Sequence, residues 1–274
     1  MNKAISVIIS TYNNEAWLEK VLWGYQRQTF KDFEMIIADD GSKPSTKTLV
    51  DSFNRTTNYN IIHVWQEDRG FQKSQILNKA IESCNAPYIV MSDGDCIPRA
   101  DFLEVHNRHK EKGYFLSGGY FKLPMSISKT INEDDIEEQR CFDLEWLKNQ
   151  GLRKSFKNLK LKVTGNFASL MNVLTPTKAT WNGHNASGWK EDIVAINGFD
   201  ERMQYGGQDR ELGERMMNNG IIGKQLRYVA ICVHLDHARG YARPESIAKN
   251  KSIRRATRTQ KKVMTPFGIK KEIS

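Results

Sequence analysis

The sequence lacks several features that would place it in common protein classes. Its four cysteines are far apart and form no CxxC pair, so it indicates neither a disulfide framework nor a zinc site. No apolar run approaches the ~20 residues that span a bilayer. The first ten residues contain too short an apolar stretch for a signal peptide and no small-residue cleavage site. We therefore expect reduced thiols and a cytoplasmic protein.

Two common nucleotide-binding motifs are also missing. No GxGxxG follows the first expected strand, and no GxxxxGK[ST] occurs anywhere in the chain. Their absence argues against a dinucleotide oxidoreductase and against a P-loop protein. No recognised nucleic-acid motif occurs either, and the basic C-terminal region lacks interleaved aromatic residues. We expect no nucleic-acid partner.

The positive charge is concentrated at one end of the chain. Residues 239–271 contain eleven Lys or Arg and one acid, a net charge of +10, whereas the whole chain carries +9. A basic tail of this kind can contact anionic lipid, anionic glycan or nucleic acid. A solvated helix that only aids solubility has the same composition, and we expect a helix over 244–262.

The first half of the chain alternates strand and helix patterns. Short apolar runs predict strands at 5–9, 33–38, 61–65 and 88–92, and apolar residues at helical spacing predict helices between them. This alternation is typical of an α/β fold with a mainly parallel sheet flanked by helices. The second half is less regular. We expect a helix over 133–150, a mobile or variable insert over 151–180, a helix that follows residue 209, and a strand pair around 225–233.

Two carboxylates follow the fourth expected strand. Asp93 and Asp95 flank Gly94 directly after an apolar run. Residues i and i+2 of a strand point the same way, so the two carboxylates can converge where the strand stops. Hard oxygen donors at an open strand end form half a site for Mg²⁺ or Mn²⁺. An Asp-Gly turn with solvated acids explains the same three residues.

Polar clusters follow two further strands of the same half. They are Thr11-Tyr12-Asn13 and Asp39-Asp40-Gly41-Ser42. Parallel strands bring their carboxyl ends to one edge of a sheet, where ligands bind. Three polar clusters at such ends indicate a ligand site more than they indicate turn chemistry alone.

Four motifs, in order and at the right spacing, give the chain a specific resemblance. They are SVIISTYNN with the following TFKDFEMIIADDGS, then QEDRGFQKSQILNKAI with APYIVMSDGDCIP, then NGFDE with GGQD, and finally HLDHARGY. Together they resemble family-2 glycosyltransferases of GT-A fold with a galactosyltransferase-type C-terminal segment, as in bacterial chondroitin-type polymerases and lipopolysaccharide or capsule enzymes. The resemblance implies a nucleotide-sugar-binding half at 1–98, an acceptor-binding and catalytic half at 99–238, and a basic tail at 239–274.

The resemblance assigns roles in donor binding. Asp39 is expected to bind the uracil ring, and Thr11, Tyr12 and Asn13 to line the base. Gly94 lets a ligand approach the backbone closely. Arg69 and Lys73 are within reach of the diphosphate, although solvated positions explain both equally well.

It also implies a divalent cation, Mn²⁺ or Mg²⁺. Asp95 is the expected direct ligand, and Asp93 is expected to contact the ribose or the metal. A late histidine completes the set in related enzymes; His234 and His237 are both candidates, and we favour His237 for its position in the motif.

Asp209 is the expected general base, with a helix N-cap as the alternative. The family's usual Glu-Asp pair is Gln208-Asp209 here, so Gln208 would position an acceptor only by hydrogen bonds. Trp181 and Trp189 could stack on a sugar ring, although a place in the core explains them at least as well. Asn78 is expected to hold loops together, and the NGFDE acids to shape a local turn or the acceptor side.

These residues predict an inverting, metal-dependent transferase that moves a hexose (Gal, GalNAc or Glc) from a UDP-sugar to a saccharide or lipid-linked saccharide acceptor of a bacterial surface glycan. The basic tail would then contact anionic lipid at the inner face of the cytoplasmic membrane. A retaining GT-A transferase and a non-catalytic module that binds a nucleotide sugar or glycan are the alternatives.

Overall fold

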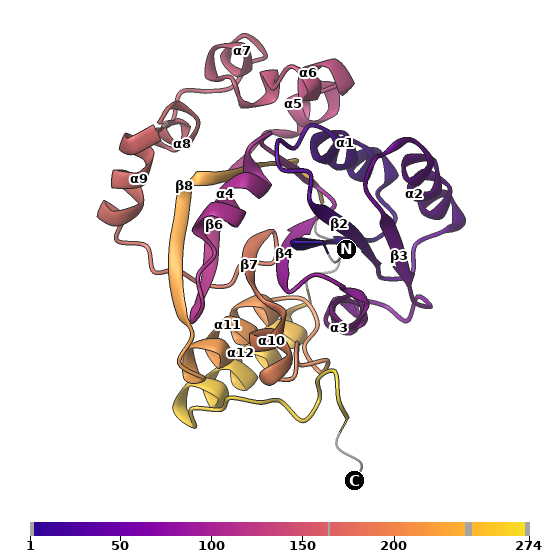
Figure 1. The fold of residues 1–274 in the computed structure, drawn as a ribbon, viewed down its shortest axis with the longest axis vertical. Coiled ribbons are helices and arrows are strands. Elements are labelled where there is room, and N and C mark those ends of the chain that lie inside the picture. The colour runs from indigo at the N-terminus through magenta and orange to yellow at the C-terminus, as the bar shows by residue number, and fades with distance from the viewer. Residues whose placement is uncertain (1–2, 164, 239–242, 272–274) are drawn as a thin grey trace.

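A computed structural model describes residues 3–163, 165–238 and 243–271 of the chain. Its strands are β1 Ile5–Thr11, β2 Phe33–Asp39, β3 Ile61–Trp65, β4 Tyr88–Asp93, β5 Cys96–Pro98, β6 Tyr114–Lys122, β7 Asn185–Trp189 and β8 Ile222–His234. They form one eight-stranded sheet in the order β3-β2-β1-β4-β7-β6-β8-β5 (Figure 1). Four of the seven pairings are parallel, so the expected mainly parallel α/β sheet is confirmed.

Helices cover both faces of this sheet. Those of the first half are α1 Glu15–Gln26, α2 Pro44–Thr56, α3 Lys73–Ser83 and α4 Phe102–His109. Those of the second half are α5 Met125–Thr130, α6 Glu133–Glu137, η1 Arg140–Phe142, α7 Leu144–Asn149, η2 Phe156–Asn158, α8 Leu159–Lys162, α9 Gly165–Leu174, α10 Lys190–Ala195, α11 Gln208–Asn218 and α12 Pro244–Thr259.

Successive residues of β1 belong to two different cores. Val7 and Ile9 pack with side chains of α1 and α2, whereas Ile8 packs with side chains of α3, α10 and α11. Side chains alternate between the two faces of a strand, so the central strands must be apolar throughout. This is why β1, β2 and β4 read as continuous apolar runs in the sequence and were predictable.

The second half differs from expectation in three places. The predicted helix over 133–150 is broken into α6, η1 and α7, because Gln139 adopts a left-handed conformation between them. The segment 151–180 is not an irregular insert but contains η2, α8 and α9. The expected strand pair is the single long strand β8, and an irregularity opposite Gly118 and Gly119 shifts its register with β6.

The basic C-terminal helix α12 packs against α11. Arg254 and Arg258 both pair with Glu214 of α11, and the buried Asn250 amide donates to the backbone of residues 204–206. Part of the tail's charge is therefore neutralised within the fold. Among the described residues, no helix is both long and apolar enough to cross a bilayer.

Candidate active site

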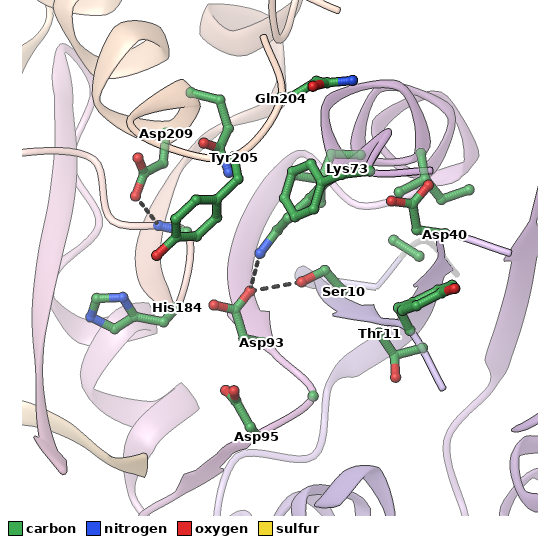
Figure 2. Close-up of a pocket in the computed structure, with 18 of the residues that line it drawn as sticks. Ser10, Thr11, Asp40, Lys73, Asp93, Asp95, His184, Gln204, Tyr205 and Asp209 are labelled. Atoms are coloured by element: carbon green, nitrogen blue, oxygen red, sulfur yellow. Dashed lines mark hydrogen bonds and ion pairs between the residues drawn. The ribbon is translucent and has the colours of Figure 1, made fainter. Parts of the chain in front are cut away.

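One large cavity lies where β1 and β4 end and where α3 and α11 begin. Its volume is about 930 Å³, and residues from both halves of the chain line it. Figure 2 shows that Asp93, Asp95 and Asp209 all reach this cavity from different segments. The sequence-predicted residues that line it are Thr11, Tyr12, Asn13, Arg69, Lys73, Asp93, Gly94, Asp95, Gln208, Asp209, His234 and His237.

The glycine of the DGD motif packs tightly against β1. The Gly94 N–H donates to the Ser10 carbonyl, and a Cβ at Gly94 would lie 3.1 Å from that oxygen and 3.2 Å from the Thr11 hydroxyl. Glycine at this position therefore brings the loop between β4 and β5 against the end of β1.

The two carboxylates of the DGD motif have different partners. Asp93 accepts hydrogen bonds from the Ser10 hydroxyl at 2.7 Å and from the Lys73 ammonium at 2.6 Å. Burial alone would raise the pKa of Asp93, but Lys73 and Ser10 outweigh it and hold the pKa below its usual range. Asp93 therefore stays ionised at the end of β4.

Asp95 lies with two histidines instead. Its carboxylate is 3.0 Å from His237 Nε2 and 3.8 Å from His234 Nε2, and one ligand atom of each residue falls within 4.8 Å of the others. The pairing of β5 with β8 brings this about, because Cys96 lies opposite His234 at the end of β8. Within the described residues, Asp93 is not part of this cluster.

The cluster suits a divalent cation. One carboxylate and two imidazoles are hard and borderline donors, a set that fits Mn²⁺ better than Mg²⁺, which prefers oxygen ligands. The sequence favoured His237 over His234 as the metal ligand. The structure brings both histidines into the cluster. The buried Nδ1 of His234 has no hydrogen-bond partner among the described residues.

Asp209 is held at the start of α11 by backbone donors. Its carboxylate accepts from the Gly183 N–H at 3.2 Å and from the Arg210 N–H at 2.8 Å. Gly206 and Gly207 precede it with positive φ angles of 113° and 89°, a conformation that favours glycine. The side chain of Gln208 is occupied locally, because its carbonyl oxygen accepts from the Gly206 N–H.

The structure corrects the expected role of Asp39. Its side chain is fully buried and accepts from the Ser42 N–H at 2.8 Å, while its other oxygen lies 2.9 Å from His63 Nε2. The neighbouring Asp40 lines the cavity instead. Adjacent residues at a strand end point to opposite sides, so only one of the two acids can face the ligand.

Asp40 is an unusual carboxyl group. Burial raises its pKa to about 6, although the Gln72 N–H and the Gln66 amide donate to its two oxygens and oppose the shift. Asp40 therefore ionises near neutral pH at the wall of the cavity.

The other expected donor-binding residues surround Asp40. Tyr12 lines the cavity, is 49% exposed and donates through its hydroxyl to Asp68. Asn13 has a positive φ of 45°, and its side-chain oxygen accepts from the Lys43 N–H. Arg69 lines the cavity but is largely solvated and paired with Glu67.

Neither predicted tryptophan lines the cavity. Trp181 is fully buried, packed against Phe115 and the backbone of Gly213, so the expectation that it stacks on a sugar is wrong. Trp189 donates to the Glu111 carbonyl and lies under the Lys112 ammonium. Both rings have structural partners outside the site.

Several cavity residues were not recognised from the sequence. His184 reaches the site from the loop before β7, and burial lowers its pKa. Its buried Nε2 has no hydrogen-bond partner among the described residues. Phe71 and Tyr205 also line the cavity, and their rings pack edge to face with their centroids 5.9 Å apart. The only sequence signal for His184 and Tyr205 was the nearby NGFDE and GGQD motifs, since Tyr205 directly precedes GGQD.

The NGFDE segment stabilises the site from outside. The Asn78 side chain bonds to both backbone groups of Phe199, which confirms that it holds loops together. Asp200 is buried and pairs with Arg202, and Glu201 accepts from Asn78. These two acids shape the local turn.

Comparison with known proteins agrees with this arrangement. The chain is 26% identical over 234 residues to validoxylamine A glucosyltransferase of Streptomyces hygroscopicus subsp. limoneus, covering 79% of this chain and 48% of that protein. It is 28% identical over 242 residues to chondroitin synthase of Escherichia coli, covering 79% of this chain and 32% of that protein. The chain thus spans about half or less of the length of these curated relatives.

Solved structures show the same fold. Residues 1–349 of S. aureus TarS, in complex with UDP-GlcNAc, superpose with a TM-score of 0.62 at 14% identity, over 95% of this chain and 69% of that one. Mannosyltransferase PcManGT from Pyrobaculum calidifontis, in complex with GDP-Man and Mn²⁺, gives 0.59 at 18% identity, over 94% and 62%. The expected GT-A fold is confirmed. The glycosyl transferase family 2 model matches residues 6–171, more than half of the sequence, so the chain belongs to this family.

Proposed function

We propose that this chain transfers a hexose from a UDP-sugar to a saccharide acceptor, with inversion at the anomeric carbon and with help from a divalent cation. The observation that carries the proposal is the single cavity that holds the Asp95–His234–His237 cluster together with Asp209. An inverting transfer needs a cation near the departing diphosphate and one carboxylate near the acceptor hydroxyl. Membership of the family, and the UDP-GlcNAc and GDP-Man complexes of structures with a similar fold, support a sugar-nucleotide donor.

The residues at the β1 and β2 ends would bind the nucleoside. Asp40 can accept the imide N–H of uracil, and the exposed ring of Tyr12 can stack on the base. Lys73, which already compensates Asp93 and lines the cavity, would contact the diphosphate. The proposal replaces Asp39 with Asp40 as the base-binding acid.

Asp95, His234 and His237 would hold the cation, and Asp93 remains a predicted contact of the ribose or the metal. When bound, the cation would neutralise charge on the departing nucleoside diphosphate. Asp209 would accept the proton of the acceptor hydroxyl while the oxygen of that hydroxyl attacks the anomeric carbon and the bond to the nucleoside diphosphate breaks. The Gly183 and Arg210 N–H groups aim its carboxylate into the cavity while that proton is taken.

The acceptor is proposed to belong to a bacterial surface polysaccharide, on the strength of relatives such as chondroitin synthase. A panel of UDP-Gal, UDP-GalNAc, UDP-Glc and GDP-Man, assayed with Mn²⁺ or EDTA, tests the proposal. Turnover of one UDP-sugar that EDTA abolishes supports it, and the anomeric configuration of the product, read by NMR, decides between inversion and retention. Binding of a donor without turnover on any acceptor would indicate a binding module instead.

A further inference from the structure

The α9 helix is apolar on two faces. Ala168 and Met171 point inward and pack with Val163 and Tyr228 in a small core of their own. The opposite face presents Phe167, Leu170, Val173 and Leu174, which are 55%, 49%, 82% and 65% exposed. A surface helix normally has polar residues on its outer face, and an outward apolar stripe marks an interaction surface.

The helix is fixed in place while its outer face is exposed. The Asn172 side chain accepts from the Tyr228 N–H of β8 at 2.8 Å. Figure 1 shows α8 and α9 on the outer side of β8, far from α1 and α2. The exposed stripe therefore faces away from the rest of the protein.

The same segment is strongly basic. Residues 151–180 contain six Lys or Arg and no Asp or Glu. Arg153, Lys154, Lys157 and Lys162 are exposed, and so is Phe156 between them, at 84%. Lys160 is the exception, because its ammonium donates to the Tyr120 carbonyl.

We propose that the surface formed by residues 153–163 and 165–174, the basic apolar face, docks on an anionic lipid bilayer. Single apolar side chains that project from a helix, bordered by Lys and Arg, are the features of helices that lie in the membrane interface. The long stems of Lys and Arg can cover apolar surface while their charges reach the headgroups. A second copy of this chain is disfavoured as the occupant, because two such basic faces would repel each other.

This surface differs from the C-terminal tail, to which sequence composition pointed. Of the described residues of α12, Arg254 and Arg258 are paired with Glu214, and α12 has no comparable row of exposed large apolar side chains.

The basic apolar face also adjoins the site. Lys160 contacts Tyr120, whose ring packs at 4.7 Å against that of His184 in the cavity wall. A bilayer-held acceptor would suit this position, a consequence that rests on the proposed function.

Vesicle sedimentation tests the docking without any enzymatic readout. Vesicles of phosphatidylcholine, with or without 30 mol% phosphatidylglycerol, are mixed with the full chain and with three double variants. Phe167→Ser/Val173→Ser removes the apolar tips, and Lys154→Glu/Lys157→Glu reverses two charges. Lys249→Glu/Lys251→Glu makes the matched charge change on exposed residues of α12. Thermal unfolding checks that each variant is folded.

We expect the wild type to bind the anionic vesicles and both variants of the basic apolar face to bind at least ~10-fold more weakly. The α12 variant should stay within about 2-fold of the wild type, because its charges lie outside the docking face. Three outcomes would overturn the proposal: no binding of the wild type, unchanged binding of the folded Phe167→Ser/Val173→Ser variant, or loss of binding confined to the α12 variant. If the wild type instead sediments as a dimer in the absence of vesicles, and the Phe167→Ser/Val173→Ser variant as a monomer, a second copy of the chain is the occupant.

Discussion

The Lys73 ammonium at the start of α3 lies 2.6 Å from the Asp93 carboxylate at the end of β4. The two side chains are 20% and 24% exposed, so water compensates either charge only partly. The pair joins α3, the helix that follows β3, to β4, the strand that ends in the DGD motif. It therefore holds a negative charge at a defined place in the cavity.

Replacement of Lys73 by Gln should destabilise the fold. Asp93 would lose its cation, and we expect the free energy of unfolding in urea to fall by about 2 kcal/mol, between the values for surface and buried pairs. Lys47→Gln is the matched control, because Lys47 makes a solvated pair with Asp51, and its cost should be much smaller than that of Lys73→Gln. Equal costs for the two variants would contradict the role given to Lys73.

Asp40 should make nucleoside binding depend on pH. Its pKa is raised to about 6, mainly by burial, so the carboxylate is ionised above that pH and protonated below it. The ionised form is the stronger acceptor for an imide N–H, and uridine affinity should fall about 10-fold from pH 7.5 to pH 5. Asp68 and Lys73 are the other charged groups that act on Asp40.

Ligand-observed NMR with uridine, in EDTA, measures this effect without a titrating phosphate or a metal. The Asp40→Asn variant should bind weakly at both pH values and lose the pH dependence. Asp39→Asn should keep it, because the Asp39 side chain is buried away from the cavity. If Asp39→Asn abolishes the pH dependence and Asp40→Asn keeps it, Asp39 is the acid that binds the uracil ring, as the sequence predicted.

His237 should be required for cation binding. His237→Ala removes one of three clustered donors, and we expect the affinity for Mn²⁺ to fall at least ~10-fold. Electron paramagnetic resonance of free Mn²⁺ measures this directly, and His109→Ala on α4 is the control. If both variants bind Mn²⁺ like the wild type, the cluster is not the cation site.

Local sequence patterns predicted the first half of the fold well. β1, β2 and β4 are buried on both faces, so apolar runs that end in polar clusters coincide with them. The edge strand β3 is only partly buried, and its apolar run alone predicted it. The second half depends on contacts that no local pattern contains. The left-handed Gln139 divides one amphipathic stretch, and the long strand β8 continues through an irregularity opposite Gly118.

The site residues divide in the same way. Motifs pointed to Asp93, Asp95, Asp209 and both histidines of the HLDH segment, and all of these line the cavity. The choice between Asp39 and Asp40 depends on where the side-chain alternation of β2 ends, which a DDGS motif does not reveal. The sequence left Trp181 open between the core and a sugar site because aromatic residues suit both, and its packing against Phe115 decides for the core.

The most direct test of the account is the sugar transfer rate of Asp209→Asn, measured beside its binding of the donor in Mn²⁺. We predict that donor affinity stays within about 3-fold of the wild type, whereas the transfer rate falls at least ~100-fold, because the acceptor hydroxyl loses its proton acceptor. Transfer at the wild-type rate by a folded Asp209→Asn protein would contradict the central claim that Asp209 is the general base of this site.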